Sequence, residues 1–271
     1  PKWSYFKRRC RGGSAMKLIL ENWRKYLNEE IQDKYQIFLD MDGVLVDMTA
    51  GVVNTVNTNL QKVRNGVSTD HNNPDSVHPG SKSKSQALRR LVKEMEKEGR
   101  EEITAEEFDH LTDLKDAEDE GFSGANKQIE RYFLKAASAN QDWWANLPSL
   151  GHAQILVDLA NEASHDGNAI ILSAPIDAAS IVGKEIWVEN NLVGIEPEKI
   201  NVVRDKGAFL KSLNLPDNII PILIDDRVKY HKQFKSAGGE VIPWDIHNPD
   251  ESFERAAEKL NSIISGKKKN D

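Results

Sequence analysis

IFLDMDGVLVD, residues 37–47, is the stretch of sequence on which the fold depends. An apolar run leads directly into Asp40 and Asp42, and Gly43 follows them. The run is typical of a buried strand, where an unpaired carboxylate is costly. Because Asp40 and Asp42 are two residues apart, both side chains point the same way if the strand stays extended. Gly43 permits a tight turn directly afterwards. We therefore expect a strand that carries two carboxylates into a functional site.

Four further apolar runs have the length of buried strands. They are NAIILSA (168–174), KINVV (199–203), IIPILID (219–225) and EVIPWD (240–245). Helical patterns lie between them, and strands that alternate with helices are typical of a parallel sheet covered on both faces. The predicted fold class is therefore α/β, with a Rossmann-like three-layer core built on a parallel sheet.

Residues 48–147 interrupt this alternation. They show helical patterns and no convincing strand, and Thr104 with Glu107 three residues later has the signature of a capping box. A polar loop rich in Gly, Pro, Ser and Asn spans residues 65–86. We therefore expect a helical cap at 48–147, inserted into a core formed by residues 16–47 and 148–266. An amphipathic helix at about 16–33 would begin that core, and residues 267–271 would form a basic, solvated tail.

The first fifteen residues, PKWSYFKRRCRGGSA, differ from the rest of the chain. They lack the apolar segment of a secretory signal. A basic cluster that ends in Gly-Gly-Ser-Ala before Met16 is typical of a leader added in cloning, and Met16 would then be the natural start. The alternative is a native basic arm that contacts an anionic surface. The fold prediction does not use residues 1–15.

The composition of the chain limits its partners and its compartment. Of its 271 residues, 39 % are hydrophobic, enough for one sizeable core and a smaller subdomain. The formal net charge of −7 favours small or cationic partners. Cys10 is the single cysteine, which fits a reducing compartment, and no apolar run approaches the roughly 20 residues of a membrane helix. We therefore expect a cytoplasmic protein that does not enter a membrane; the sequence leaves its oligomeric state open.

Polar side chains stand at or just after the predicted strand ends. They are Asp40, Asp42, Ser173, Lys206, Asp225 and Asp226. Binding sites in open parallel sheets form at the carboxyl ends of the strands, so these groups are expected to converge. Four crowded carboxylates would raise one another's pKa, and Mg²⁺ suits several hard oxygen ligands. Each residue alone has an ordinary explanation as a turn, a helix cap or a surface charge. The ordered set favours a catalytic site for an anion, with phosphate as the first candidate.

These residues resemble the motifs of the haloacid dehalogenase-like (HAD) phosphohydrolases. FLDMDGV matches the first motif, a hydrophobic strand followed by DxDG, and IILSA matches the second, a strand that ends in Ser or Thr. Lys206 matches the third motif and ILIDDR the fourth. The resemblance implies that Asp40 forms an aspartyl-phosphate and that Asp42 is the general acid and base. It also implies that Ser173 and Lys206 hold the phosphoryl oxygens. The implied ligands of Mg²⁺ are Asp40, the backbone carbonyl of Asp42, and Asp225 or Asp226.

Within that superfamily, the sequence is most similar to the 5'(3')-deoxyribonucleotidases. The similar segments are WWANLPSLGHAQILVDLA (143–160), LSAPI (172–176), GKEIWVENNL (183–192), VVRDK (202–206) and LIDDR (223–227). Ala174 stands where that family has a second small hydroxyl residue, and residues 48–142 do not align. The resemblance implies a phosphomonoesterase that acts on a (deoxy)nucleoside monophosphate.

A cap inserted between the first and second motifs is expected to exclude water and to contact the substrate. For a nucleotide, aromatic rings of the cap would stack on the base. Trp143 and Trp144 are candidates, of which one is expected to pack in the core and one to face the substrate. Phe122 is another aromatic candidate, and Arg227 is a further candidate for substrate binding.

Two other functions stay open. A polynucleotide 3'-phosphatase shares the DxDG and DDR features, but the acidic net charge and the expected absence of a basic stripe in the cap argue against it. A catalytically silent relative could bind a nucleotide or a partner protein, but the intact catalytic set argues against that. We expect a Mg²⁺-dependent phosphomonoesterase for a small substrate, with a nucleoside monophosphate as first candidate and without nucleic acid as a partner.

Overall fold

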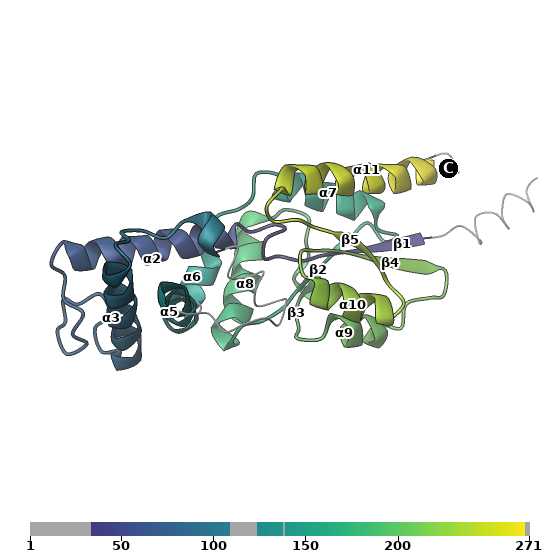
Figure 1. The fold of residues 1–271 in the computed structure, drawn as a ribbon. Coiled ribbons are helices and arrows are strands. Elements are labelled where there is room, and N and C mark those ends of the chain that lie inside the picture. The colour runs from purple at the N-terminus through teal and green to yellow at the C-terminus, as the bar shows by residue number, and fades with distance from the viewer. Residues whose placement is uncertain (1–33, 109–123, 138, 269–271) are drawn as a thin grey trace, which may run out of the picture.

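The computed structural model describes residues 34–108, 124–137 and 139–268 of the chain (Figure 1). The expected leader at 1–15, the expected helix at 16–33, Phe122 and the last residues of the tail lie outside the described residues.

A parallel five-stranded sheet forms the centre of the core. Its strands stand in the order β3–β2–β1–β4–β5. They are β1 (Lys34–Leu39), β2 (Ile170–Ser173), β3 (Ile200–Val202), β4 (Ile219–Asp225) and β5 (Glu240–Pro243). All five lie within or overlap the apolar runs of the sequence, and the predicted α/β fold class is confirmed.

The register of the two central strands places two carboxylates side by side. Leu39 of β1 pairs with Ile224 of β4. The amide of the next residue, Asp40, donates to the carbonyl of Ile224 at 2.9 Å. Because Asp225 follows Ile224, Asp40 and Asp225 reach the same edge of the sheet.

Helices cover both faces of the sheet (Figure 1). One layer contains α7 (Ala153–Ala163) and α11 (Pro249–Lys268), and the opposite layer contains α9 (Lys206–Ser212) and α10 (Val228–Ser236). Strand β1 packs against both helix layers, because the side chains of successive strand residues point to opposite faces of the sheet. Ile37 and Leu39 join the hydrophobic cluster of α7 and α11, whereas Phe38 joins the cluster of α9 and α10. The remaining core elements are α8 (Ala178–Asn191) and the 3₁₀ turn η3 (Pro197–Lys199).

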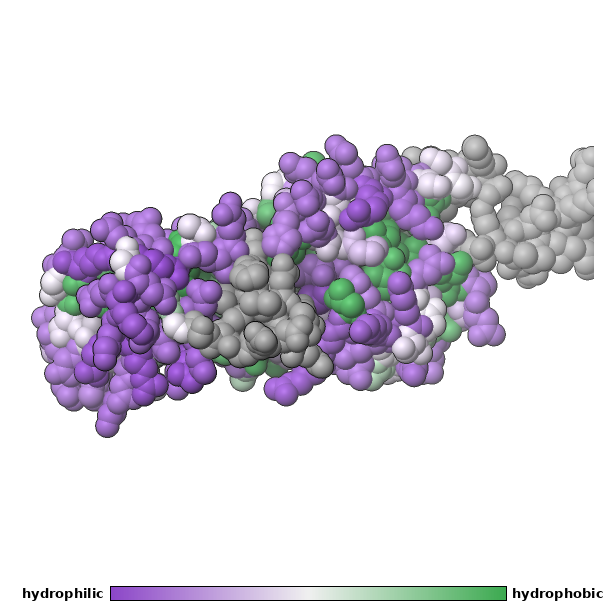
Figure 2. Space-filling model, viewed as in Figure 1, coloured by the Kyte–Doolittle hydropathy of each residue, from purple (hydrophilic) through white to green (hydrophobic). Residues whose placement is uncertain are grey.

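Residues 48–147, here called the cap, extend from one end of the core (Figure 1). The described elements of the cap are α2 (Met48–Arg64), α3 (Lys82–Lys97), α5 (Gly124–Tyr132), the π-helical turn η2 (Phe133–Ala137) and α6 (Gln141–Ala145). The cap has its own hydrophobic cluster, in which Val56 of α2, Leu88 of α3 and Ile129 of α5 are fully buried. The surface of the cap is mainly hydrophilic on the side shown in Figure 2.

Local signals in the cap are partly confirmed. The amide of Thr104 donates to Oε2 of Glu107 at 2.9 Å and the amide of Glu107 donates to Oγ1 of Thr104 at 3.3 Å, so the capping box is confirmed. The polar loop is shorter than predicted, because α3 already begins at Lys82. Ser85 in its first turn is buried, and its hydroxyl donates to the carbonyl of His78 at 3.3 Å. This contact fixes the end of the loop against the helix.

The expectation that the cap lacks a basic stripe is wrong. Helix α3 exposes Lys82, Arg89, Arg90, Lys93 and Lys97. Their spacing places them on one side of the helix, whereas the apolar residues of α3 face the cap interior.

No helix in the described part of the chain is long and apolar enough to cross a membrane.

Candidate active site

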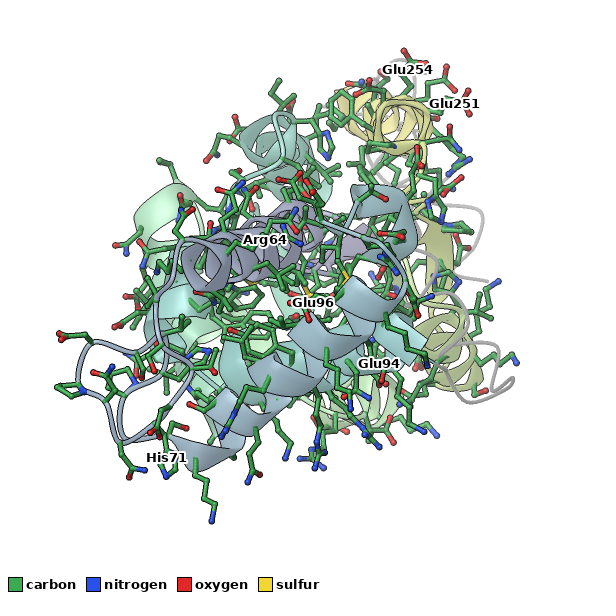
Figure 3. The ribbon with its side chains drawn as sticks, turned by 60° about the vertical axis from the view of Figure 1, so that its left-hand side comes forward. Arg64, His71, Glu94, Glu96, Glu251 and Glu254 are labelled. Carbon is green, nitrogen blue, oxygen red and sulfur yellow. The ribbon has the colours of Figure 1, made fainter. Side chains whose placement is uncertain are left out.

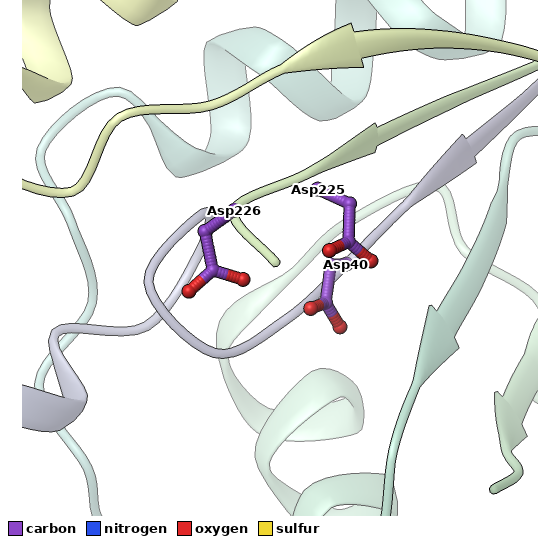
Figure 4. Close-up of side chains that lie close together, drawn as sticks. All are labelled: Asp40, Asp225 and Asp226. Carbon is purple, nitrogen blue, oxygen red and sulfur yellow. The ribbon is translucent and has the colours of Figure 1, made fainter. Parts of the chain in front are cut away.

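Three carboxylates meet at the carboxyl end of the sheet (Figure 4). Asp40 follows β1, Asp225 ends β4 and Asp226 follows it. Each offers an oxygen atom that lies within 4.8 Å of the corresponding oxygen of the other two. Asp40 is 2 % exposed and Asp225 is fully buried. The structure thus brings together three of the four carboxylates that the sequence placed at strand ends; Asp42 is not part of this group.

Gly43 makes the approach of the loop after β1 to Asp226 sterically feasible. Its φ of +76° lies in the left-handed region, which favours glycine. A Cβ atom there would lie 2.8 Å from Cγ2 of Ile246 and 3.3 Å from Oδ2 of Asp226. A larger residue would therefore strain the backbone and push Asp226 away from the other carboxylates.

Lys206, the first residue of α9, lies fully buried between two of these carboxylates. Its Nζ is 2.9 Å from Oδ1 of Asp40 and 2.5 Å from Oδ2 of Asp225. Burial alone would lower the pKa of Lys206, but the charges of Asp40 and Asp225 outweigh it and raise the pKa. Lys206 therefore stays protonated. The side chain of Asp205 caps α9 by accepting from the amide of Ala208 at 2.8 Å, which fixes the start of the helix.

The acidic cluster carries more negative charge than Lys206 can balance. Burial, opposed by Lys206 and reinforced by Asp40, raises the pKa of Asp225 to about 7. Burial together with the charges of Asp40 and Asp225 raises the pKa of Asp226. Oδ1 of Asp226 is buried, and no described protein atom forms a hydrogen bond with it. A buried carboxylate oxygen without a donor, beside two further carboxylates, fits a hard divalent cation such as Mg²⁺.

Asp42 is held by a lysine that the sequence analysis did not assign to the site. Nζ of Lys184, a residue of α8, is 2.6 Å from Oδ2 of Asp42 and also donates to Oγ of Ser173 at 3.0 Å. It donates to the carbonyl of Ala174 at 2.7 Å as well, and the side chain is fully buried. Burial raises the pKa of Asp42, Lys184 opposes this, and the charge of Asp40 adds to it.

Lys184 reaches this position because α8 packs closely on α6. A Cβ atom on Gly183 would lie 2.4 Å from Cβ of Trp144, so glycine permits the contact. Nζ of Lys184 then lies 4.8 Å from the centre of the Trp144 ring. The sequence signal was the helical spacing of Lys184 with Ser180 and Trp187, which are also buried. A lysine on the buried face of a helix requires an acidic or polar partner.

A cavity of about 360 Å³ opens beside the carboxylates. Its wall includes Asp40 and Asp226 of the acidic cluster and also Asp42. The remaining wall is largely apolar and aromatic and includes Phe108 of the cap and Ile176, Tyr230 and Trp244 of the core. Arg227, a predicted substrate-binding residue, also lines the cavity. Ser173 and Lys206, the two predicted phosphate-binding residues, are fully buried and do not line this cavity.

The prediction that Trp143 or Trp144 faces the substrate needs correction. Trp144 is fully buried in the core, and neither ring lines the cavity. Trp143 lies between the two hydrophobic clusters, and its Nε1 donates to Oγ1 of Thr55 at 2.9 Å. Its ring packs edge-on against Phe133 and Trp144. Both rings thus join the cap to the core, and Phe108 is the cap aromatic that the structure places at the cavity.

Comparisons with known proteins give structural neighbours only. No protein-family model matches the sequence, and no curated protein sequence is similar to it. A candidate phosphoglycolate phosphatase from Lactobacillus delbrueckii subsp. bulgaricus is 13 % identical, with a TM-score of 0.44 over 85 % of this chain and 98 % of that chain. A candidate haloacid dehalogenase-like hydrolase from Burkholderia xenovorans LB400 is 10 % identical, with a TM-score of 0.40 over 78 % of this chain and 81 % of that one.

A third neighbour is a phosphonoacetaldehyde hydrolase-like protein from Oleispira antarctica. It is 10 % identical, with a TM-score of 0.35 over 86 % of each chain. The first of these neighbours is named as a phosphatase, the second as a haloacid dehalogenase-like hydrolase and the third as a hydrolase-like protein. With TM-scores below 0.5, the similarities add nothing to the assignment of chemistry, which rests on the site itself.

Proposed function

We propose that the protein is a Mg²⁺-dependent phosphomonoesterase that works through an aspartyl-phosphate. The observation that supports this most directly is that oxygen atoms of Asp40, Asp225 and Asp226 lie within 4.8 Å of one another, and that the buried ammonium of Lys206 pairs with Asp40 and Asp225. Three carboxylates carry more negative charge than one lysine neutralises, so the site would bind a divalent metal ion. The metal ion and the lysine together would then attract a phosphoryl group.

Asp40 would act as the nucleophile. Its carboxylate oxygen attacks phosphorus, a bond forms between Asp40 and the phosphoryl group, and the bond from phosphorus to the leaving oxygen breaks. Asp42 protonates that oxygen, so the product leaves as an alcohol. In the second step Asp42 takes a proton from water, the water oxygen attacks phosphorus, and the bond to Asp40 breaks to release phosphate.

Lys206 and Lys184 would have different tasks in this reaction. Lys206 contacts Asp40 directly and would neutralise negative charge as the phosphoryl group approaches. Lys184 contacts Asp42 and would orient the carboxylate that exchanges the proton. The Ser173 hydroxyl accepts a hydrogen bond from Nζ of Lys184 at 3.0 Å, at the same point. We therefore assign Ser173 to the support of Lys184 and Asp42 as well as to the phosphate.

Mg²⁺ would be held by Asp40 and by Asp225 or Asp226, with the backbone carbonyl of Asp42 as a further ligand. The donor set consists of hard oxygen atoms, which fit this ion. When bound, Mg²⁺ would neutralise negative charge on the phosphoryl oxygens and on the carboxylates.

The first substrate candidate is a nucleoside monophosphate. A cavity of about 360 Å³ falls within the usual size of small-molecule sites, and it begins at the proposed nucleophile. Phe108 and Tyr230 offer aromatic surface to a planar base, and Arg227 offers a cation. The sequence resemblance to the deoxyribonucleotidases supports the same choice.

The experiment that tests the function is a phosphate-release screen. Ribo- and deoxyribonucleoside 5'- and 3'-monophosphates are compared with sugar phosphates, each with Mg²⁺ and with excess chelator. Asp40→Asn is the control, because it keeps the shape of the side chain and removes the nucleophile; we expect turnover to fall by several orders of magnitude. Unchanged turnover in this variant would refute the assignment of Asp40. Tight nucleotide binding without phosphate release from any substrate would instead indicate a catalytically silent binding protein.

A polynucleotide 3'-phosphatase is a second candidate that one observation favours. The basic face of α3 removes one of the two arguments against it. The same screen separates the candidates: faster release from a 3'-phosphorylated oligonucleotide than from any mononucleotide would favour the polynucleotide substrate.

A further inference from the structure

The outer face of α3 carries a concentration of positive charge that the proposed catalytic site does not use. The helix contains six Lys or Arg residues and two Glu residues, a formal charge of +4, in a chain whose net charge is −7. Among the described residues, only Lys97 of the exposed cations on this helix forms an ion pair, at 3.6 Å from Glu94. Charge of the opposite sign to the rest of the protein, left unpaired on one surface, points to an anionic partner.

The exposed cations form a narrow row. At 3.6 residues per turn, the five exposed cations fall within a sector of about 100° around the helix axis. They are Lys82, Arg89, Arg90, Lys93 and Lys97, here called the α3 row. From Lys82 to Lys97 the row extends about 22 Å along the axis at a rise of 1.5 Å per residue. No acidic residue interrupts the sector; Glu94 and Glu96 lie at its margins.

Helix α3 is anchored, so the row is presented as a rigid surface. Leu88, Leu91 and Met95 on the opposite side are at most 1 % exposed and belong to the hydrophobic cluster of the cap. Figure 3, turned so that the cap comes forward, shows α3 at the front of the cap, with Glu94 and Glu96 near one end of the helix. The cations thus point away from the cap interior while their backbone stays fixed.

We propose that the α3 row binds the phosphate backbone of a nucleic acid. A row about 22 Å long with a cation at nearly every turn matches a linear polyanion, whose charges repeat along a line. A membrane surface would instead favour a helix that also offers an apolar face, and the apolar face of α3 is buried. An acidic protein would be expected to meet exposed apolar or aromatic anchors, and α3 has no exposed large hydrophobic residue.

The binding would be independent of base sequence. Lys and Arg contacts to phosphates position a nucleic acid but do not read its bases. Among the residues of α3 none is aromatic, so this helix offers the bases no aromatic ring to stack on. The α3 row is a surface of the cap, and binding there does not depend on the chemistry of the acidic cluster.

The test is a salt titration of oligonucleotide binding. The probe is a fluorescein-labelled single-stranded 20-nucleotide DNA without terminal phosphate, followed by anisotropy with the full chain between 50 and 200 mM NaCl. The test variant is Arg89→Gln/Arg90→Gln/Lys93→Gln, and the matched control is Lys211→Gln/Lys232→Gln/Lys235→Gln, which removes three exposed cations from the core. Helix propensity changes little in either variant.

A phosphate contact to a single strand contributes about 0.7 to the slope of log K against log salt. We therefore expect the slope of the test variant to be smaller than that of the wild type by about 2, and its affinity at 50 mM NaCl to fall at least 10-fold. The control variant should keep the wild-type slope and affinity. Circular dichroism and phosphate release from a mononucleotide should be unchanged in both, and Asp40→Asn should bind DNA like the wild type, so a failure of the proposed catalytic function would be recognised separately.

Three results would overturn the proposal. Equal losses of DNA affinity in the test and control variants would show that the net charge of the protein controls binding, and not the position of the cations on α3. Absence of oligonucleotide binding at 50 mM NaCl would exclude the partner. Binding to phosphatidylserine vesicles that depends on the α3 row, without binding to DNA, would identify a membrane surface instead.

Discussion

Lys184 and Asp42 form a buried ion pair in which Nζ lies 2.6 Å from Oδ2. The lysine comes from a helix of the core and the aspartate from the loop after the central strand, 142 residues earlier in the chain. Because Nζ also donates to Ser173 and to the carbonyl of Ala174, Lys184 has few positions open to it. Asp42 is therefore held in one orientation beside Asp40, as a group that exchanges a proton with the leaving oxygen requires.

Replacement of Lys184 by methionine should impair catalysis more than binding. The change keeps the approximate length of the side chain but removes the donor that orients Asp42. Because Asp42 itself remains, we expect kcat to fall about 10- to 100-fold, less than the roughly 10²- to 10⁴-fold that a general acid–base group contributes, with KM nearly unchanged. Steady-state kinetics on the best substrate of the screen would measure this. Lys199→Met is the control, since Lys199 pairs with Asp166 at 2.8 Å on the surface. An increase in KM without loss of kcat would show that Lys184 binds the substrate instead.

Removal of divalent cations should lower both activity and stability. Mg²⁺ would reduce the repulsion between Asp226 and the neighbouring carboxylates. Because the ion would bind the folded state, it should stabilise that state by about 2.7 kcal/mol at a Mg²⁺ concentration of 100 times Kd. Differential scanning fluorimetry with and without Mg²⁺ would detect this as an increase in Tm. Asp226→Asn should reduce the increase, whereas Asp217→Asn, an exposed aspartate in the turn before β4, should not. An equal Tm with and without Mg²⁺ in the wild type would contradict a metal site here.

The sequence predicted the site residues that lie at the ends of strands. Asp40 and Asp225 each follow a run of apolar residues, and parallel strands bring their carboxyl ends to one edge, so the spacing of the runs was sufficient. Lys206 was also predicted from its place after a strand run, the one at 199–203, and the resemblance of its Arg-Asp-Lys segment supported that choice. Lys184 was missed as a site residue because its partner is 142 residues away, and only the packing of α8 on α6 shows which carboxylate it meets.

The errors in the cap have two different origins. The position of Trp143 depends on contacts with two separate hydrophobic clusters, and no local pattern of the sequence encodes that. The basic row of α3 was encoded locally: Arg89, Arg90 and Lys93 follow Lys82 at helical intervals. Counting the charge of the whole chain concealed it, because the acidic residues elsewhere outweigh it.

Phe108 and Trp143 give opposite predictions for substrate recognition. Phe108 lines the cavity, so Phe108→Leu should raise KM for a nucleotide about 3- to 10-fold through loss of about 1 kcal/mol of aromatic contact, and leave KM for a small substrate such as p-nitrophenyl phosphate less affected. Trp143→Phe removes the hydrogen bond to Thr55 and should lower Tm without changing KM. Kinetics with both substrates and thermal unfolding of both variants would measure these effects. A larger KM change for Trp143→Phe than for Phe108→Leu would restore Trp143 as the base-stacking residue.

The cap should lose stability in mild acid because of a half-buried histidine. Nε2 of His78 is 2.6 Å from the hydroxyl of Tyr132, which also accepts from Nδ2 of Asn59 at 2.9 Å. The proton of the Tyr132 hydroxyl can be donated to Nε2 of His78, which accepts it only in the tautomer whose Nε2 is unprotonated. Burial, followed by the charges of Lys84 and Lys62, lowers the pKa of His78 below its ordinary value of 6.5.

The direction of the effect follows from this lowered pKa. Well above pH 6.5, as at pH 7.5, His78 is mostly neutral in both the folded and the unfolded state. As the pH falls below 6.5, the unfolded chain binds a proton that the folded protein does not, so the free energy of unfolding decreases until the folded pKa is passed. Urea unfolding at pH 7.5 and 5.5 should show a larger loss for the wild type than for His78→Gln, whose amide can accept from Tyr132 but does not titrate. His152 and His231 also have lowered pKa values and act equally in both proteins, so only the difference reports on His78. The same pH dependence in the two proteins would show that the His78–Tyr132 hydrogen bond does not sense protons.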